Sequence, residues 1–338
     1  MYPIIILGAG ASYDCIDREK HLQGPYRDDN LNVYRPPLLN QLFDPNRFHS
    51  FIKDYPEVGS LASDAIGVAD FEKYLTDIEE VKALKNRERY GQLIALRFYL
   101  RKLFTSISDN YYRPVNYYRK LLNIIDDAGE VSCFVNFNYD LLLEKNINKI
   151  ITSLDIDDYI AGNKKVIKIH GACNWFYQME DDFSLKTAYK HFSFFAENFV
   201  KFIREERPDK KISIINEDIS WNGTIVKGDR RSHYLPALAV PATTKANYVC
   251  PDSHIDELKR ILVATDRILI IGWQANDSYL VSLITKIIEK PVKVTIVTRT
   301  SSQRIQDKLS GNSNLSFKPL GMDFSTFMRS EELMIFFS

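Results

Sequence analysis

Residues 4–12 read IIILGAGAS, and this stretch decides which fold class the chain can adopt. A run of apolar, largely β-branched residues is typical of a strand buried on both faces of a parallel sheet, so we predict a strand over Tyr2–Leu7. Gly8 ends the run and Gly10 follows closely, which permits a tight turn and a close backbone approach to phosphate oxygens. The stretch therefore predicts the first strand and turn of an α/β fold.

Similar apolar runs recur along the chain and predict further strands at Val131–Phe137, Lys165–Ile169, Leu235–Val240, Arg267–Ile271 and Val292–Val297. Apolar residues spaced three and four apart predict helices over Asp70–Leu84, Tyr90–Ile107, Tyr117–Asp126, Leu141–Ile151, Pro251–Ala264 and Asp277–Ile288. Residues 14–35 are predicted to be a long loop, and residues 315–337 a strand and a final helix. Alternating strands and helices predict a Rossmann-like, doubly wound, mostly parallel sheet with helices on both faces.

The composition excludes several classes of protein. The chain has 338 residues, with 44 Lys+Arg against 44 Asp+Glu, so bulk charge gives no reason to expect direct nucleic-acid or membrane-surface binding. We expect one domain, with a helical insertion at 172–234. The start of the chain lacks a basic leader, and no apolar run approaches the ~20 residues of a membrane span, so we expect a cytoplasmic protein.

Cysteine spacing bears on metal binding. The four cysteines are Cys15, Cys133, Cys173 and Cys250, and none lies within four residues of another. This spacing gives no CxxC zinc signature, and reduced cysteines in a chain of this length are typical of the cytosol. We therefore expect no metal site.

Small or polar residues directly follow five of the predicted strands. Because ligands of doubly wound sheets bind beyond the carboxyl ends of the strands, these residues are the candidates for a site. They are Gly8–Ser12, Asn138–Asp140, His170–Gly171, Pro241–Lys245 and Gly272–Gln274.

Each of these segments, taken alone, admits a structural interpretation. Tyr13 holds the third glycine position of the dinucleotide fingerprint, so the first turn fits a plain strand–helix connection as well as a nucleotide site. Asp140 can cap the following helix, although that leaves Asn138 unexplained. A histidine such as His170 is more often structural than catalytic, yet imidazole titrates near neutral pH and can act as a general base.

Taken together and in order, Gly-Ala-Gly-x-Ser, Asn-x-Asp and His-Gly at successive strand ends resemble the sirtuin superfamily over nearly the whole chain. The resemblance implies a set of NAD-binding residues: Gly8, Ala9, Gly10 and Ser12 at the pyrophosphate, Asp140 at the nicotinamide carboxamide, and Gly272 on the adenosine side. It also implies that Asn138 orders water beside the nicotinamide ribose and that His170 is the base there. Asp277 either caps a helix or contacts NAD.

Departures from the family pattern narrow the expected activity. Residues 172–234 contain only Cys173, whereas the deacetylases hold zinc there with two cysteine pairs. Phe137 replaces the glutamine that normally precedes the asparagine, and residues 240–245 replace the stretch that clasps acetyl-lysine. The NAD half is kept and the acyl-lysine half is lost, which is similar to the sirtuin-like NADases of bacterial anti-phage defence.

That narrower resemblance implies an NAD glycohydrolase that releases nicotinamide and ADP-ribose, with NAD as substrate and no zinc. It also implies a homo-oligomer and a regulatory partner encoded nearby, either a HerA-type ATPase or a short Argonaute. Two alternatives stay open at this point. One is an NAD-dependent ADP-ribosyltransferase or deacylase, and the other is a non-catalytic nucleotide-binding regulatory subunit.

Overall fold

The structure is a computed structural model, and it describes residues 2–22, 28–65, 74, 87–179, 211–217, 219, 223–227, 230–240 and 248–337. Contacts divide the chain into two compact units. The first comprises Met1–Leu38, Ser106–His170 and Lys245–Ser338, and the second comprises Leu39–Thr105 and Gly171–Thr244. Whether the chain is one domain with an insertion at 172–234 stays a prediction.

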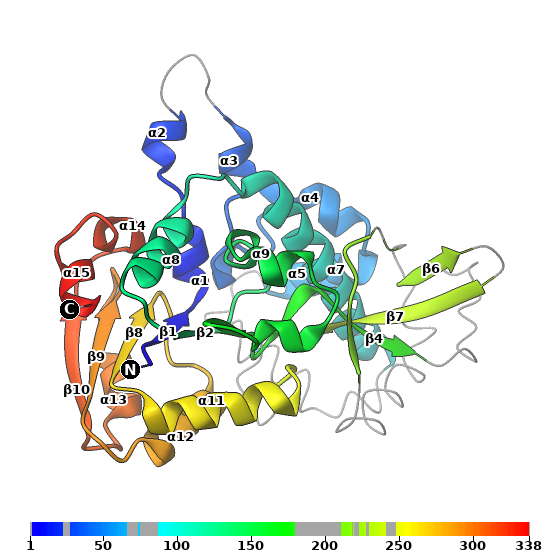
Figure 1. The fold of residues 1–338 in the computed structure, drawn as a ribbon. Helices are drawn as coiled ribbons and strands as arrows, with labels where there is room; N and C mark the ends of the chain where they lie inside the picture. The colour runs from blue at the N-terminus through cyan, green and yellow to red at the C-terminus, as the bar shows by residue number, and fades with distance from the viewer. Residues whose placement is uncertain are drawn as a thin grey trace. The chain divides into compact units, whose positions relative to one another are not determined.

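The first unit is built on a six-stranded sheet whose strands all run parallel, in the order β10-β9-β8-β1-β2-β3 (Figure 1). The strands are β1 (Ile4–Leu7), β2 (Ser132–Asn136), β3 (Lys164–Ile167), β8 (Arg267–Ile271), β9 (Val292–Val297) and β10 (Leu315–Leu320). The predicted α/β class, with its Rossmann-like parallel sheet, is confirmed. The chain adds strands first on one side of β1 and then on the other, so the order reverses between β1 and β8, where such folds bind ligands.

Burial explains why β1 is the central strand. All four of its residues are at most 1% exposed, and Ile5 lies between Phe134 of β2 and Leu269 of β8. Burying each such side chain contributes about 1.5–3 kcal/mol. A strand that is apolar on both faces is stable only with a layer on each side, which is the arrangement that the sequence predicts.

The helices of the first unit agree with the strongest periodic patterns. The helices α8 (Tyr117–Asp127), α11 (Asp252–Ala264) and α12 (Ser278–Ile287) match their predicted ranges to within two residues. The unit also contains α1 (Ala9–Tyr13), α2 (Arg18–Leu22), α3 (Asn30–Val33), α9 (Asn148–Thr152), α13 (Gln303–Leu309), α14 (Phe324–Phe327) and α15 (Glu332–Phe337). Thus the predicted loop at 14–35 contains two short helices, and the predicted strand and helix of the C-terminal segment are present.

The helix predicted over Leu141–Ile151 is wrong. The structure has a turn followed by the 3-10 helix η3 (Glu144–Asn146), and an extended Ile147 separates this from α9. Side chains accept hydrogen bonds from the first backbone N–H groups of this segment. The Ser108 hydroxyl accepts from the Leu141 N–H, and the Asp140 carboxyl accepts from the Leu142 N–H. These local bonds compete with a regular helix.

The second unit contains a four-stranded antiparallel sheet in the order β5-β4-β7-β6. Its strands are β4 (Gly171–Met179), β5 (Ile212–Ile214), β6 (Thr224–Lys227) and β7 (Arg230–Leu238). Its helices are η1 (Leu39–Gln41), α4 (Pro45–Lys53), α5 (Pro56–Ala65) and α7 (Arg87–Tyr111), of which the residues from Ser106 onward belong to the first unit. The helix predicted over Tyr90–Ile107 is therefore present as part of α7.

One expectation about this region is corrected. The run Leu235–Val240 does not join the parallel sheet: residues up to Leu238 belong to β7, which pairs antiparallel with β4. An apolar run signals burial but not the partner strand. The described residues of 172–234 include strands, and the helical insertion expected there stays a prediction. The helical character expected near 192–203 lies outside the described residues, as does nearly all of the helix predicted at 70–84.

No helix in the described part of the chain is long and apolar enough to cross a membrane.

Three glycines bring the exits of β1 and β8 into backbone contact. A Cβ on Gly8 would lie 2.4 Å from the Gly272 carbonyl oxygen, and one on Gly272 would lie 2.6 Å from the Gly10 Cα. Gly272 also has φ +62, a region that other residues avoid. The N–H of Gly8 donates to Ile271 at 3.0 Å, which extends the ladder into the turn. The glycine pattern therefore serves first to let two loops touch.

Replacing Gly272 by alanine is expected to destabilise the first unit strongly. The positive φ costs about 1–3 kcal/mol, and the clash with the Gly10 backbone adds to it. Gly321→Ala is the matched control, because a Cβ there would meet nothing within 4 Å. Urea unfolding of the two variants measures the difference. Equal free energies of unfolding would show that the glycine contact is not needed.

Candidate active site at the strand ends

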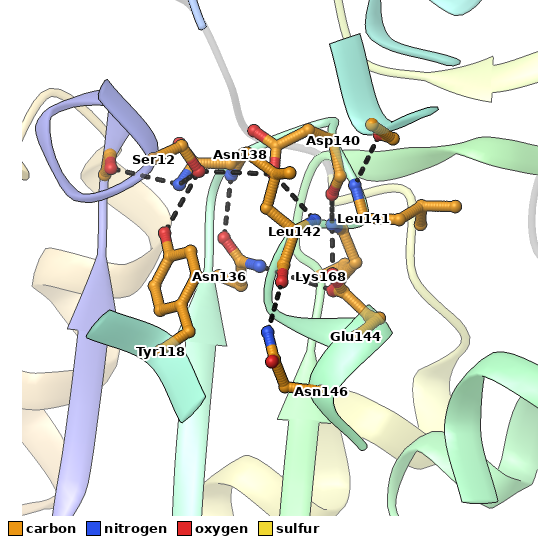
Figure 2. Close-up of polar contacts among 12 residues, drawn as sticks. Ser12, Tyr118, Asn136, Asn138, Asp140, Leu141, Leu142, Glu144, Asn146 and Lys168 are labelled. Atoms are coloured by element: carbon orange, nitrogen blue, oxygen red, sulfur yellow. Dashed lines mark hydrogen bonds and ion pairs between the residues drawn. The ribbon is translucent and has the colours of Figure 1, made fainter. Parts of the chain in front are cut away.

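The Asn138 side chain is fixed by the turn after β1. Its Nδ2 donates to the Gly8 carbonyl and to the Ser12 hydroxyl, at 3.0 Å each (Figure 2). Because the Gly8 carbonyl can only accept, the amide must present its NH₂ group on this side. Asn138 is only 7% exposed, and its Oδ1 is the side-chain atom left to accept a hydrogen bond. The residue is thus held in one orientation with a single acceptor available.

Every hydrogen-bonding position of the Ser12 hydroxyl is used. The hydroxyl donates to Asp140 Oδ1 at 3.2 Å, accepts from Asn138, and lies 3.0 Å from the Tyr118 hydroxyl. Since Ser12 has one proton and gives it to Asp140, Tyr118 must be the donor in the last contact. Burial raises the pKa of Tyr118 well above its ordinary value, which keeps that proton on the phenol. Ser12 therefore holds other side chains in place.

Asp140 is buried and stabilises the turn that follows β2. Its Oδ1 accepts from Ser12 and from the backbone N–H of Leu142, the latter at 3.1 Å. Burial raises the pKa of Asp140, and the Lys168 ammonium opposes that shift. No helix begins directly after Asp140, so the capping role considered for it is not found; its carboxyl instead bonds within the turn, to the Leu142 N–H, and to Ser12.

A buried ion pair lies beside this group. Lys168 and Glu144 are both 0% exposed, and Lys168 Nζ lies 2.9 Å from Glu144 Oε1 and 2.6 Å from the Asp140 backbone carbonyl (Figure 2). Asn136 donates to the same Glu144 oxygen at 3.3 Å. Glu144 Oε2 is buried and has no hydrogen-bond partner among the described residues. Burial raises the pKa of Glu144, and Lys168 opposes that shift as well. The ammonium therefore ties the segment after β3 to the turn after β2.

His170 contacts groups from two other strand ends. Its Nε2 lies 3.0 Å from Asp277 Oδ2, and its ring meets the edge of Phe137 with centroids 4.9 Å apart. Phe137 in turn stacks on Trp273, which follows β8, at 5.5 Å. Tyr139 also lies near the histidine, with its ring centroid 6.5 Å from that of His170. Both aromatic residues that flank Asn138 therefore lie beside the imidazole.

Asp277 performs the capping role that the sequence allowed. It is the N-cap of α12, and its Oδ1 accepts from the backbone N–H of Leu280 at 2.8 Å. Its other oxygen contacts His170, a pairing that the sequence does not reveal.

The structure thus places the predicted residues in three groups at the carboxyl ends of the strands of the parallel sheet. Ser12, Asn138 and Asp140 form one hydrogen-bonded set, and His170 pairs with Asp277. Gly8, Gly10 and Gly272 make the backbone contact, with Ala9 exposed at the tip of the turn.

Sequence reasoning missed Tyr118, Glu144 and Lys168 as members of the site, whereas Trp273 lies in the candidate segment Gly272–Gln274. The signal for Lys168 was present, because a lysine between two isoleucines at the end of a buried strand requires a partner. Nothing local marks Tyr118 or Glu144.

No group of three or more His, Cys, Asp or Glu side chains in the described ranges is arranged to hold a metal ion. The four cysteines are free and buried. The expectation that the protein has no zinc stays a prediction.

Comparison with known proteins gives structural neighbours only. No family model matches the chain, and no curated protein matches it. The chain is similar to a Sir2 homologue in complex with NAD, with 13% identity and a TM-score of 0.44, over 99% of this chain and 89% of that one. It is also similar to Sir2 bound to an inhibitor, 2′-O-acetyl-ADP-ribose and a deacetylated peptide, with 14% identity and a TM-score of 0.44, over 100% and 95%. At this sequence identity and TM-score, the likeness says nothing about activity.

The Lys168–Glu144 pair is expected to show strong energetic coupling. Lys168→Met or Glu144→Leu alone leaves a buried group without its partner and costs about 3–5 kcal/mol. The double variant contains neither of the two charges. Its free energy of unfolding should therefore be higher than the sum of the two single-variant losses predicts. The matched cycle uses the exposed pair Lys259 and Asp256, whose coupling should stay below about 1 kcal/mol. Similar coupling in both cycles would contradict the interpretation.

The pH dependence of Glu144→Gln follows from the raised pKa of Glu144. A carboxyl whose pKa is raised by folding stabilises the fold fully below its unfolded pKa of about 4.3, and this contribution is lost as pH rises through the folded pKa. Glutamine does not titrate and loses no such contribution. The difference in Tm, variant minus wild type, should therefore increase as pH rises from about 4 upward. The exposed control Glu331→Gln should follow the wild type at every pH. A gap that widens in favour of the wild type would refute this.

Proposed function

We propose that the protein is an NAD glycohydrolase, which cleaves NAD to nicotinamide and ADP-ribose. The observation that carries this proposal is the fixed amide of Asn138, whose remaining side-chain acceptor is Oδ1 and which bonds to the turn after β1, beside the switch point of a doubly wound sheet. His170 follows the neighbouring strand and supplies an imidazole. This pairing of a water-orienting amide with a base is what the sirtuin-like motifs imply.

The proposed NAD-binding residues lie around the glycine contact. Ala9 and Gly10 form the accessible part of the turn after β1, where the pyrophosphate would lie, and Gly272 lines the adenosine side. Asp140 is proposed for the nicotinamide carboxamide. Ser12 supports this site indirectly, since its hydroxyl is already committed to Asn138, Asp140 and Tyr118.

The chemistry needs few groups because nicotinamide in NAD is a cationic leaving group. The bond between the ribose C1′ and the ring nitrogen breaks, and its electron pair goes to the ring, which becomes neutral. The ribose passes through an oxocarbenium-like state, which preorganised polar groups stabilise. A water molecule oriented by Asn138 Oδ1 bonds to C1′, and its proton goes to His170. The products are nicotinamide and ADP-ribose.

An enzyme that depletes NAD must be kept inactive until it is needed. We therefore extend the proposal to an abortive-infection effector in anti-phage defence, controlled by self-assembly or by a partner encoded nearby. This extension rests on the resemblance to sirtuin-like NADases, which lack the acyl-lysine elements that are also missing here.

The direct test is to incubate the full-length protein with NAD and measure nicotinamide and ADP-ribose, over a range of protein concentrations and with the product of the adjacent gene. Asn138→Ala and His170→Ala should each lower nicotinamide release by roughly 10²–10⁴-fold. Both variants should remain folded at the assay temperature, although Asn138→Ala leaves the buried Gly8 carbonyl without this donor and should unfold at a lower temperature than the wild type.

The matched controls are Asn110→Ala and His49→Ala, which replace exposed residues of the same types. Both should release nicotinamide at the wild-type rate. NAD binding without nicotinamide release in every condition would overturn the hydrolase and favour a nucleotide-binding subunit. Labelled ADP-ribose appearing on protein would favour a transferase.

A further inference from the structure

The contact between His170 and Asp277 joins two strand ends that are not neighbours. His170 follows β3 and Asp277 follows β8, and β2 and β1 lie between them in the sheet. Three strand spacings amount to about 14 Å, so the two segments must converge over the ends of the strands between them. The carboxylate and the ring nevertheless meet at 3.0 Å. Such a contact is not a by-product of strand pairing.

Asp277 is held rigidly by bonds at both of its oxygens. Oδ1 accepts from the Leu280 N–H as the N-cap of α12, and Oδ2 contacts His170 Nε2. The Asp277 and His170 side chains are only 4% and 12% exposed. The N-terminal end of a helix is a favourable place for a carboxylate that accepts from the backbone N–H groups, as Asp277 does. An ionised carboxyl accepts hydrogen bonds and cannot donate one.

This arrangement decides which nitrogen of His170 carries the proton. Because Asp277 only accepts, Nε2 must be the N–H donor, and in the neutral ring the basic lone pair is then on Nδ1. The Phe137 ring packs against the imidazole in a T-shaped contact, with the ring centroids 4.9 Å apart. A buried carboxylate beside the ring also stabilises the imidazolium that forms when the base takes a proton.

We infer that Asp277 is the positioning residue of the site: it fixes His170 in the tautomer protonated at Nε2, so that Nδ1 receives the proton of the attacking water. The catalytic part of this inference rests on the proposed NAD hydrolysis, whereas the tautomer does not.

The test uses Asp277→Asn in the full-length protein. The amide oxygen of asparagine can still cap α12, but its NH₂ faces Nε2 and favours the opposite tautomer. Nitrogen NMR of histidine-labelled protein measures the tautomer, and His170→Gln identifies the His170 signals among the six histidines. We expect the wild type to be protonated at Nε2 and the variant at Nδ1, with kcat for nicotinamide release lowered ~10²–10⁴-fold and KM changed much less.

Asp323→Asn is the matched control, because Asp323 caps α14 by the same bond, to Thr326 N at 2.8 Å. It should change neither the His170 tautomer nor kcat. Asp277→Ser is the second variant, since serine is also a good N-cap but cannot reach the ring. It should give a mixed tautomer and an intermediate kcat, which separates the histidine contact from the helix cap.

The outcomes distinguish this inference from the proposed function. An unchanged tautomer in Asp277→Asn overturns the inference at any rate of hydrolysis. A changed tautomer with wild-type kcat overturns the positioning role. If the wild type releases no nicotinamide while the tautomer changes as expected, the pairing is supported and NAD hydrolysis is rejected.

Discussion

The backbone contact between the turns after β1 and β8 is the constraint on which the rest of the site depends. Gly8 and Gly10 lie so close to Gly272 that no side chain fits between them. This closeness sets the position of the Gly8 carbonyl, which accepts from Asn138. A displacement of the turn would move that carbonyl and release the amide. The glycines therefore act on the site through the orientation of an asparagine.

Beneath this contact, buried charge links the remaining strand ends. One ammonium, that of Lys168, contacts the Glu144 carboxyl and the backbone carbonyl of Asp140, so the segment after β3 and the turn after β2 share a single cation. Burial raises the pKa of the Asp140 and Glu144 carboxyls, and this one ammonium opposes both shifts. Such groups are costly to bury, and their value lies in fixing one arrangement of the loops rather than in stability.

How far the sequence predicts the structure depends on the range of the interactions. The strands of the parallel sheet and the helices α8, α11 and α12 follow from local periodicity, and the site segments follow from their places after strands. The partner of Leu235–Val240 could not be predicted, because burial alone does not distinguish a parallel from an antiparallel neighbour. The pairing of His170 with Asp277 could not be predicted either, because it depends on how two loops converge across the sheet. The missing helix at 141–151 reflects competition from Ser108 and Asp140 for backbone N–H groups.

The pairing of β1 with β8 has a consequence for how the protein is made. Ile4 lies opposite Ile268 in the sheet, so β1 waits for a strand that is synthesised much later before its second edge is covered. Contacts of such long sequence separation fold slowly, and parallel sheets are exposed to aggregation meanwhile. Gly8 and Gly10 cannot contact Gly272 until Gly272 itself has left the ribosome. The site therefore assembles only after β8 and the turn that follows it have emerged.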